Sequence, residues 1–159
     1  MANTKLAYGG ATNITCTLAS LATAGVRECT AVDNSANLYL DAMLYIACAL
    51  QAGSPASDKV INIYFYGSAD GTNYTDNATG SDAAVTLRDP SNLRGPFVIA
   101  APTAGALTYK GVVGSVAQYF GGVLPYKWGF AIENRTNITF SATESDHTKQ
   151  YRGVYATGT

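Results

Sequence analysis

Residues 119–142 read YFGGVLPYKWGFAIENRTNITFSA, and this stretch contains the only tryptophan of the chain. Apolar residues occupy every second position from Trp128 to Ile132, which is the period of a strand with one buried face. The same spacing returns at residues 138–142, after a polar break. The break, residues 133–137, is rich in turn-forming residues. We therefore expect the two halves to pair as an antiparallel hairpin whose large aromatic side chains anchor a core.

Alternating or β-branched segments recur along the rest of the chain. We predict further strands at residues 14–18, 26–32, 38–50, 60–66, 85–87, 93–101, 107–113, 116–120 and 150–155. For residues 38–50 a helix is the competing interpretation, because leucine, alanine and methionine favour helices, but the long alternation favours a strand. About eight to ten short strands separated by turn signals predict an all-β fold, namely an antiparallel two-sheet sandwich of the jelly-roll type.

The length and composition suit a single domain. The chain has 159 residues, of which 47% are hydrophobic. We expect one β-sandwich domain at residues 12–159 and a flexible N-terminal arm at residues 1–11, which either stays disordered or becomes ordered on a neighbouring subunit. Only 13% of the residues are charged, whereas soluble chains typically carry about a quarter. A surface of this kind suits a protein that packs against other proteins.

Charge and hydropathy argue against two classes of partner. The net charge is −1 and the sequence contains no basic run, so we do not expect binding to nucleic acid. No stretch approaches the ~20 apolar residues of a membrane-spanning helix. The first residues also lack the apolar segment of a signal peptide, so we expect synthesis in a cytoplasm and no membrane partner.

The three cysteines do not form a recognisable metal site. Cys16, Cys29 and Cys48 are 13 and 19 residues apart in sequence, without the closely spaced pairs that zinc requires. Cys16 and Cys48 lie on apolar alternating faces, where a free thiol behaves as a small buried hydrophobic group. We therefore expect these cysteines to fill the core.

The sequence shows no catalytic constellation. His147 is the only histidine and lies in a polar stretch, so we expect it to be exposed and not to serve as a base. Only the fold can decide whether the carboxylates pair as in glycosidases, and the candidates are Asp41, Glu133, Glu144 and Asp146. Asp70, Asn73 and Asp76 lack the spacing of an EF-hand loop. We predict neither an enzyme nor a bound cofactor or metal.

Two segments resemble a known class of proteins. Residues 63–74 read IYFYGSADGTNY, a strand followed by a loop with an Asp-Gly turn, and residues 121–129 read GGVLPYKWG. Together they resemble small virion structural proteins of tailed bacteriophages, in particular jelly-roll capsid decoration (cement) proteins. The resemblance implies a non-enzymatic homotrimer on the exterior of the virion, made in the host cytoplasm. Its partner would be the major capsid protein, and it would stabilise the head by bridging capsid subunits.

The resemblance makes the apolar side chains around the second segment candidates for contacts between subunits or with the capsid. The candidates are Tyr119, Phe120, Leu124, Tyr126 and Trp128. Ordinary core packing is the alternative for each of them. Two other functions remain open: a phage tail or fibre component, and a carbohydrate-binding sandwich that uses some of the 11 tyrosines.

Overall fold

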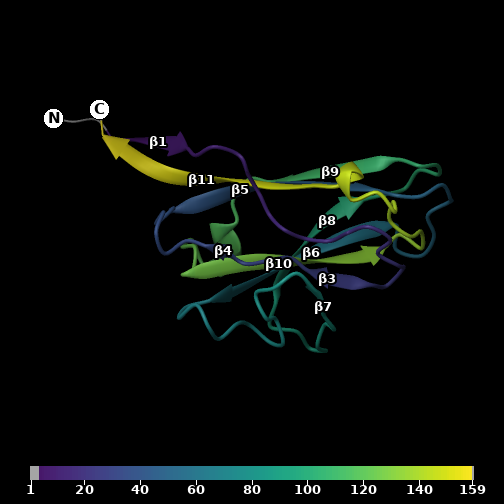
Figure 1. The fold of residues 1–159 in the computed structure, drawn as a ribbon, viewed down its shortest axis with the longest axis horizontal. Helices are drawn as coiled ribbons and strands as arrows, with labels where there is room; N and C mark the ends of the chain where they lie inside the picture. The colour runs from purple at the N-terminus through teal and green to yellow at the C-terminus, as the bar shows by residue number, and fades with distance from the viewer. Residues whose placement is uncertain (1–3, 159) are drawn as a thin grey trace.

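The computed structural model describes residues 4–158, which form two antiparallel β-sheets packed face to face (Figure 1). The first sheet has the order β1-β11-β5-β9, with β2 beside β11. Its strands are β1 (Thr4–Tyr8), β2 (Thr12–Asn13), β5 (Asp41–Ala49), β9 (Thr108–Val113) and β11 (Thr148–Gly158). The second sheet has the order β7-β3-β10-β6-β8, with β4 beside β10. Its strands are β3 (Val26–Glu28), β4 (Val32–Asp33), β6 (Val60–Ser68), β7 (Ala83–Ala84), β8 (Arg94–Ala100) and β10 (Lys127–Arg135).

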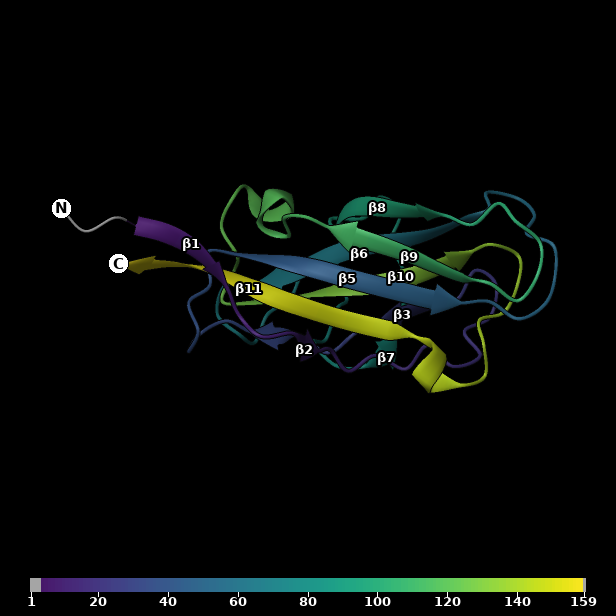
Figure 2. The ribbon, with the colours of Figure 1, turned by 90° about the horizontal axis from the view of Figure 1, so that it is seen from above.

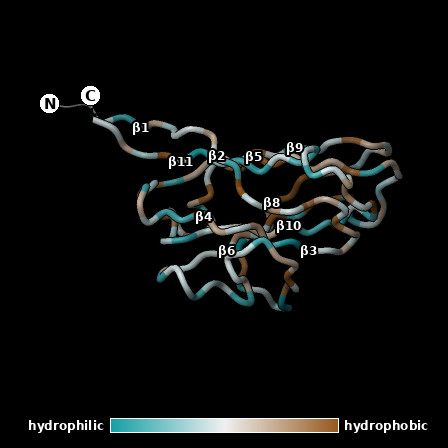
Figure 3. Tube along the Cα trace, in the orientation of Figure 1, coloured by the Kyte–Doolittle hydropathy of each residue, from teal (hydrophilic) through white to brown (hydrophobic). Residues whose placement is uncertain are grey.

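The prediction of an all-β, antiparallel two-sheet sandwich is confirmed. Alternate side chains of each long strand enter the space between the sheets, as the burial of every second residue along the first half of β5 and β6 shows. In Figure 3 hydrophobic positions recur along the strands of both layers. Trp128 is 1% exposed and lies edge-on to Tyr151 of the first sheet, with ring centroids 5.5 Å apart. This contact joins the two sheets through the core.

The two chain ends form a ribbon that projects from the sandwich (Figures 1 and 2). β1 pairs with β11 from Thr4 opposite Gly158 to Tyr8 opposite Val154. β5 begins opposite Val154, so beyond this residue only the two terminal strands remain paired. We refer to β1 and residues 154–158 as the terminal ribbon. A strand therefore forms within the predicted arm, where we expected no element, whereas residues 1–3 of that arm lie outside the described residues.

The predicted hairpin is wrong. β10 has β6 on one side and β3 and β4 on the other, so neither of its edges can accept residues 138–142. Instead the chain turns at Asn137, which has φ 65°, and Phe140 bridges Leu50 beside the first sheet. Asn134 fixes this corner, because its side-chain amide donates to the carbonyl of Ile138 at 2.7 Å while its oxygen accepts from the hydroxyl of Thr136. The residues predicted to form a hairpin turn, 133–137, thus begin the connection by which the chain passes from the second sheet to the first.

Three other predicted strands, at residues 14–18, 85–87 and 116–120, are absent from the described residues. The short strand β7 ends at Ala84, just before the second of these. Residues 117–120 form the 3-10 helix η1 (Ala117–Phe120), whose first N–H donates to the carboxylate of Asp41 at 2.8 Å. Residues 14–18 form no strand, although Cys16 and Leu18 are buried. The N–H groups of Thr17 and Leu18 donate to the carboxylates of Asp82 and Glu144 and not to a neighbouring strand. A second 3-10 helix, η2 (Glu144–Asp146), precedes β11. Among residues 4–158 we find no helix long and apolar enough to cross a membrane.

Candidate functional site

The five predicted contact residues lie on η1, just before β10 and at its start, and Tyr126 is the exposed one among them. Trp128 and Leu124 are buried in the core. Tyr119 and Phe120 are half-buried on η1, where the Tyr119 ring stacks on Phe65 with centroids 4.3 Å apart. Tyr126 is 49% exposed and points away from the core. Four of these side chains are therefore packed into the protein, and the aromatic ring of Tyr126 is accessible to a partner.

The two segments on which the resemblance rests are neighbours in the fold. The end of β6 pairs with the start of β10, so that Gly67 lies opposite Trp128. A Cβ on Gly67 would lie 2.8 Å from Pro125, and one on Gly71 would lie 2.9 Å from Tyr126. Both glycines are thus required by the close approach of the loop after β6 to the segment before β10.

The Asp70 loop is held by its own hydrogen bonds. The Asp70 carboxylate accepts from the backbone N–H of Thr72 and of Asn73, each at 2.8 Å. The N–H and side chain of Asn73, together with the other donors, lower the pKa of Asp70. Asp76 accepts instead from Asn92, at 2.8 Å. Within residues 4–158, no group of three or more histidine, cysteine, aspartate or glutamate side chains is placed to hold a metal ion.

Exposed apolar side chains gather at the end of the sandwich from which the terminal ribbon projects. Among the described residues, seven of the ten exposed large hydrophobic side chains lie on the ribbon, before β5 or before β10 (Figure 1): Leu6, Tyr8, Leu38, Leu40, Val123, Tyr126 and Tyr155. Asn34 joins the segment before β5 to the segment before β10. Its N–H donates to the carbonyl of Tyr126 at 3.0 Å, and its side chain donates to the carbonyl of Tyr39 at 3.1 Å. We call this set of seven side chains the apolar end.

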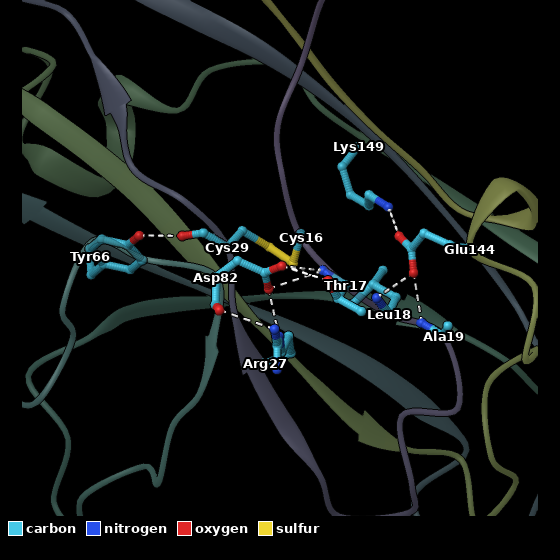
Figure 4. Close-up of a disulfide and its surroundings, with 10 residues drawn as sticks. All are labelled: Cys16, Thr17, Leu18, Ala19, Arg27, Cys29, Tyr66, Asp82, Glu144 and Lys149. Atoms are coloured by element: carbon cyan, nitrogen blue, oxygen red, sulfur yellow. Dashed lines mark hydrogen bonds and ion pairs between the residues drawn. A yellow bond between two sulfur atoms is a disulfide. The ribbon is translucent and has the colours of Figure 1, made fainter.

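A disulfide joins Cys16 to Cys29 and fixes the segment that leads to β3 (Figure 4). The expectation that Cys16 is a free thiol is therefore wrong, because the fold brings the Cα atoms of the two cysteines to 4.3 Å. Sequence spacing could not reveal this proximity. The expectation for Cys48 is confirmed: it is free and buried, and burial raises the pKa of its thiol to about 12.

Two carboxylates hold the same segment on either side of the disulfide (Figure 4). Asp82 accepts from the backbone N–H of Thr17 at 3.0 Å and from the guanidinium of Arg27. Glu144 accepts from the N–H of Leu18 at 2.8 Å and is paired with Lys149. Burial acts to raise the pKa of both carboxyls, but these hydrogen bonds and cations outweigh it, so both pKa values are lowered.

The single histidine is buried, contrary to expectation. His147 is buried beside Phe140, and its Nδ1 accepts from the backbone N–H of Ala49 at 3.2 Å. Its Nε2 lies 3.2 Å from the carbonyl of Ser141, so the neutral ring with the proton on Nε2 satisfies both partners. Burial lowers the pKa of His147. The ring therefore serves to connect the end of β5 with the segment before β11.

Each of the four carboxylates considered for catalysis has a separate structural partner. Asp41 accepts from the N–H of Ala117, and Asp146 accepts from the Ser141 hydroxyl. Glu133 accepts from the side chain of Asn62 at 2.9 Å, on the outer side of the second sheet. Glu144 holds the segment beside the disulfide. Each of these carboxylates thus accepts a hydrogen bond that holds part of the fold in place.

An open depression of about 590 Å³ lies between residues 17–27 and 84–87. Small aliphatic and hydroxyl side chains line most of it, with Arg27 and Glu133 as its charged members. A sugar ring would find no aromatic surface on which to stack among these lining residues.

Comparison with known proteins gives no family assignment: no family model matches the chain, and neither a curated protein nor a solved structure matches it. What the chain does must therefore be inferred from its own surfaces.

Proposed function

We propose that this chain is a non-enzymatic structural protein of a phage virion, a capsid decoration protein that stabilises the head by bridging capsid subunits. It works as a homotrimer on the capsid exterior, and its partner is the major capsid protein. The observation that carries the proposal is the apolar end, where exposed leucine, valine and tyrosine side chains gather around the terminal ribbon. Apolar surface that is concentrated at one place is typical of protein interfaces.

Two further observations support the proposal. The segments that resemble decoration proteins, residues 63–74 and 121–129, adjoin each other beside Tyr126 at this end. The Cys16–Cys29 disulfide also suits the exterior of a virion, because disulfides persist in oxidising surroundings and are rare in a cytosol.

A binding assay tests the proposal directly. Purified protein is mixed with heads of the encoding phage from which this protein has been removed, and the bound fraction is measured by sedimentation. We expect saturable binding, and we expect Tyr126→Ala to weaken it about tenfold, because exposed tyrosines are frequent interface anchors. Leu107→Ala is the matched control, since Leu107 is also exposed but precedes β9 at the opposite end of the sandwich (Figure 2). Failure of the unaltered protein to sediment with heads would overturn the assignment, and binding to tails instead would favour a tail component.

Light scattering at micromolar concentration tests the oligomeric state separately. We expect a mass of about three protomers, since repeated joints on a shell favour multivalent units. A monomer both in solution and on the head would contradict the trimer.

A further inference from the structure

The outer face of the first sheet carries an apolar strip flanked by cations. Side chains alternate along a strand, so Met43 and Tyr45 point away from the core that Leu44 enters. The register places Arg152 opposite Met43, and Val112 opposite Tyr45. These four side chains from three adjacent strands therefore share one face.

This face is uncovered and hollowed. Figure 2 shows β5, β9 and β11 with only the chain between β1 and β2 crossing over β11. A depression of about 300 Å³ lies on the face, lined by Met43, Tyr45, Val112 and Arg152 together with Gln150 and Ala11. Val112 lies within β9, yet its apolar side chain is 54% exposed. The depression has room for one aliphatic or aromatic side chain of a partner.

Arg152 is the one charged residue that lines this depression, and Lys110 lies two residues before Val112 on β9. Arg152 and Lys110 are exposed, and Lys110 lies opposite Ala47 on the same face as Val112. Asp41 is the one acidic residue of the face within β5, β9 and β11. Its carboxylate already accepts from the N–H groups of Ala42 and Ala117, at 2.7 and 2.8 Å. Arg152 also donates to the carbonyl of Gly9 at 3.0 Å, but a neutral carbonyl does not offset its charge. None of the ion pairs among residues 4–158 involves Arg152 or Lys110, so both cations can complement negative charge on a partner.

We propose that this face binds an acidic segment of another protein. One apolar side chain of the segment enters the depression between Met43, Tyr45 and Val112, and carboxylates beside it pair with Arg152 and Lys110. The proposed site lies on the outer face of the first sheet, apart from the Tyr126 region of the apolar end, so it stands independently of the capsid assignment. The chain would then have two binding surfaces, one at the end of the sandwich and one on its face.

A protein segment fits these observations better than nucleic acid does. Two cations beside an apolar strip provide few phosphate contacts, whereas nucleic-acid sites are strongly basic. An apolar side chain between two carboxylates matches both the depression and the charges.

Titration of isotope-labelled protein with a synthetic peptide tests the proposal. The probe is an acidic peptide with a single leucine flanked by glutamates, and the comparison peptide replaces the glutamates with lysines. We expect the acidic peptide to shift the backbone amide signals of Tyr45, Val112 and Arg152, and the basic peptide to leave them unchanged. Val112→Asp and the double variant Lys110→Glu, Arg152→Glu should each weaken binding at least tenfold. Arg94→Glu, an exposed charge reversal on β8 of the second sheet, is the matched control.

Four outcomes would overturn the proposal. The first is the absence of shifts at this face with the acidic peptide, and the second is equal binding of the basic peptide. The third is stronger binding of a single-stranded oligonucleotide, which would make the face a nucleic-acid site. The fourth is a set of shifts that appears on concentrating the protein alone, which would make it a contact between copies. The capsid assignment is judged separately, because it depends on sedimentation with heads and on Tyr126.

Discussion

The two sheets of the sandwich differ in what covers their outer faces. Residues 69–93 fold beneath the second sheet, whereas the first sheet has no comparable layer (Figures 1 and 2). The cover is held by Glu28, which is 1% exposed and accepts from the N–H groups of Thr79 and Gly80. Tyr66 is buried under the same segment and packs edge-on against Tyr74.

The difference shows which polar and aromatic side chains are committed to the fold. On the covered face Tyr66 and Glu28 have intramolecular partners, and burial raises the pKa of Tyr66. On the uncovered face Tyr45 and Val112 remain accessible beside two cations. An outward tyrosine of a β-sheet is thus structural in one sheet and available for a partner in the other.

The largest expected effect concerns the link between the sheets. The Cys16–Cys29 disulfide ties β3 of the second sheet to the segment that follows β2 of the first. We expect Cys16→Ser with Cys29→Ser to lower the free energy of unfolding by about 3 kcal/mol, as is typical for closing a loop of this size. Urea denaturation measures the loss.

Thiol counting is the control for that experiment. The native protein should expose no thiol to an alkylating reagent, and the unfolded, unreduced protein should expose one, from Cys48. Three alkylated cysteines in the unreduced, unfolded protein would contradict the disulfide.

A smaller effect should separate the two outer faces. Glu28→Ala removes a buried carboxylate and leaves the partly buried N–H groups of Thr79 and Gly80 without their acceptor, so we expect a loss of about 2 kcal/mol and faster amide exchange in residues 79–80. Val112→Ala on the uncovered face should change the free energy of unfolding by no more than about 0.5 kcal/mol. Equal losses of unfolding free energy in both variants would contradict the conclusion that only the second sheet has a cover that stabilises the fold.

The smallest effect is a dependence of stability on pH that comes from His147. Burial lowers its pKa, so the folded state prefers the neutral ring and the unfolded state binds more protons. Stability from this group is complete above the unfolded pKa of about 6.5 and decreases as the pH falls below it. Because the chain has one histidine, His147→Gln should remove the slope between pH 6.5 and 5. Asp82 and Glu144 act in a more acidic range, since their lowered pKa values make their contribution disappear only below about pH 4.

Local patterns predicted the strands that carry most of the core. The β-branched and aromatic run at residues 60–66 is β6, which lies between β10 and β8, and its bulk on both faces is explained by the core on one side and the cover on the other. The alternation from Trp128 to Ile132 became β10, and the alternation at residues 38–50 became β5. Each is a property of consecutive residues, which a sequence pattern records.

Features that depend on distant residues could not be predicted in this way. Residues 138–142 have the period of a strand but cross to the first sheet, because both edges of β10 are occupied. His147 stands among polar residues but is buried under Phe140. Of the five candidate contact residues, the structure leaves Tyr126 largely exposed and buries Trp128 and Leu124, which no spacing in the sequence distinguishes.

The sequence by itself determined the fold class, the low charge and the strands that build the core, because alternation and composition act over neighbouring residues. Only the tertiary structure decided that Cys16 meets Cys29, that one outer face is covered and the other free, and that the chain ends form a projecting ribbon. Each of these depends on how segments far apart in sequence pair across the sheets, and that pairing is set by the shared core.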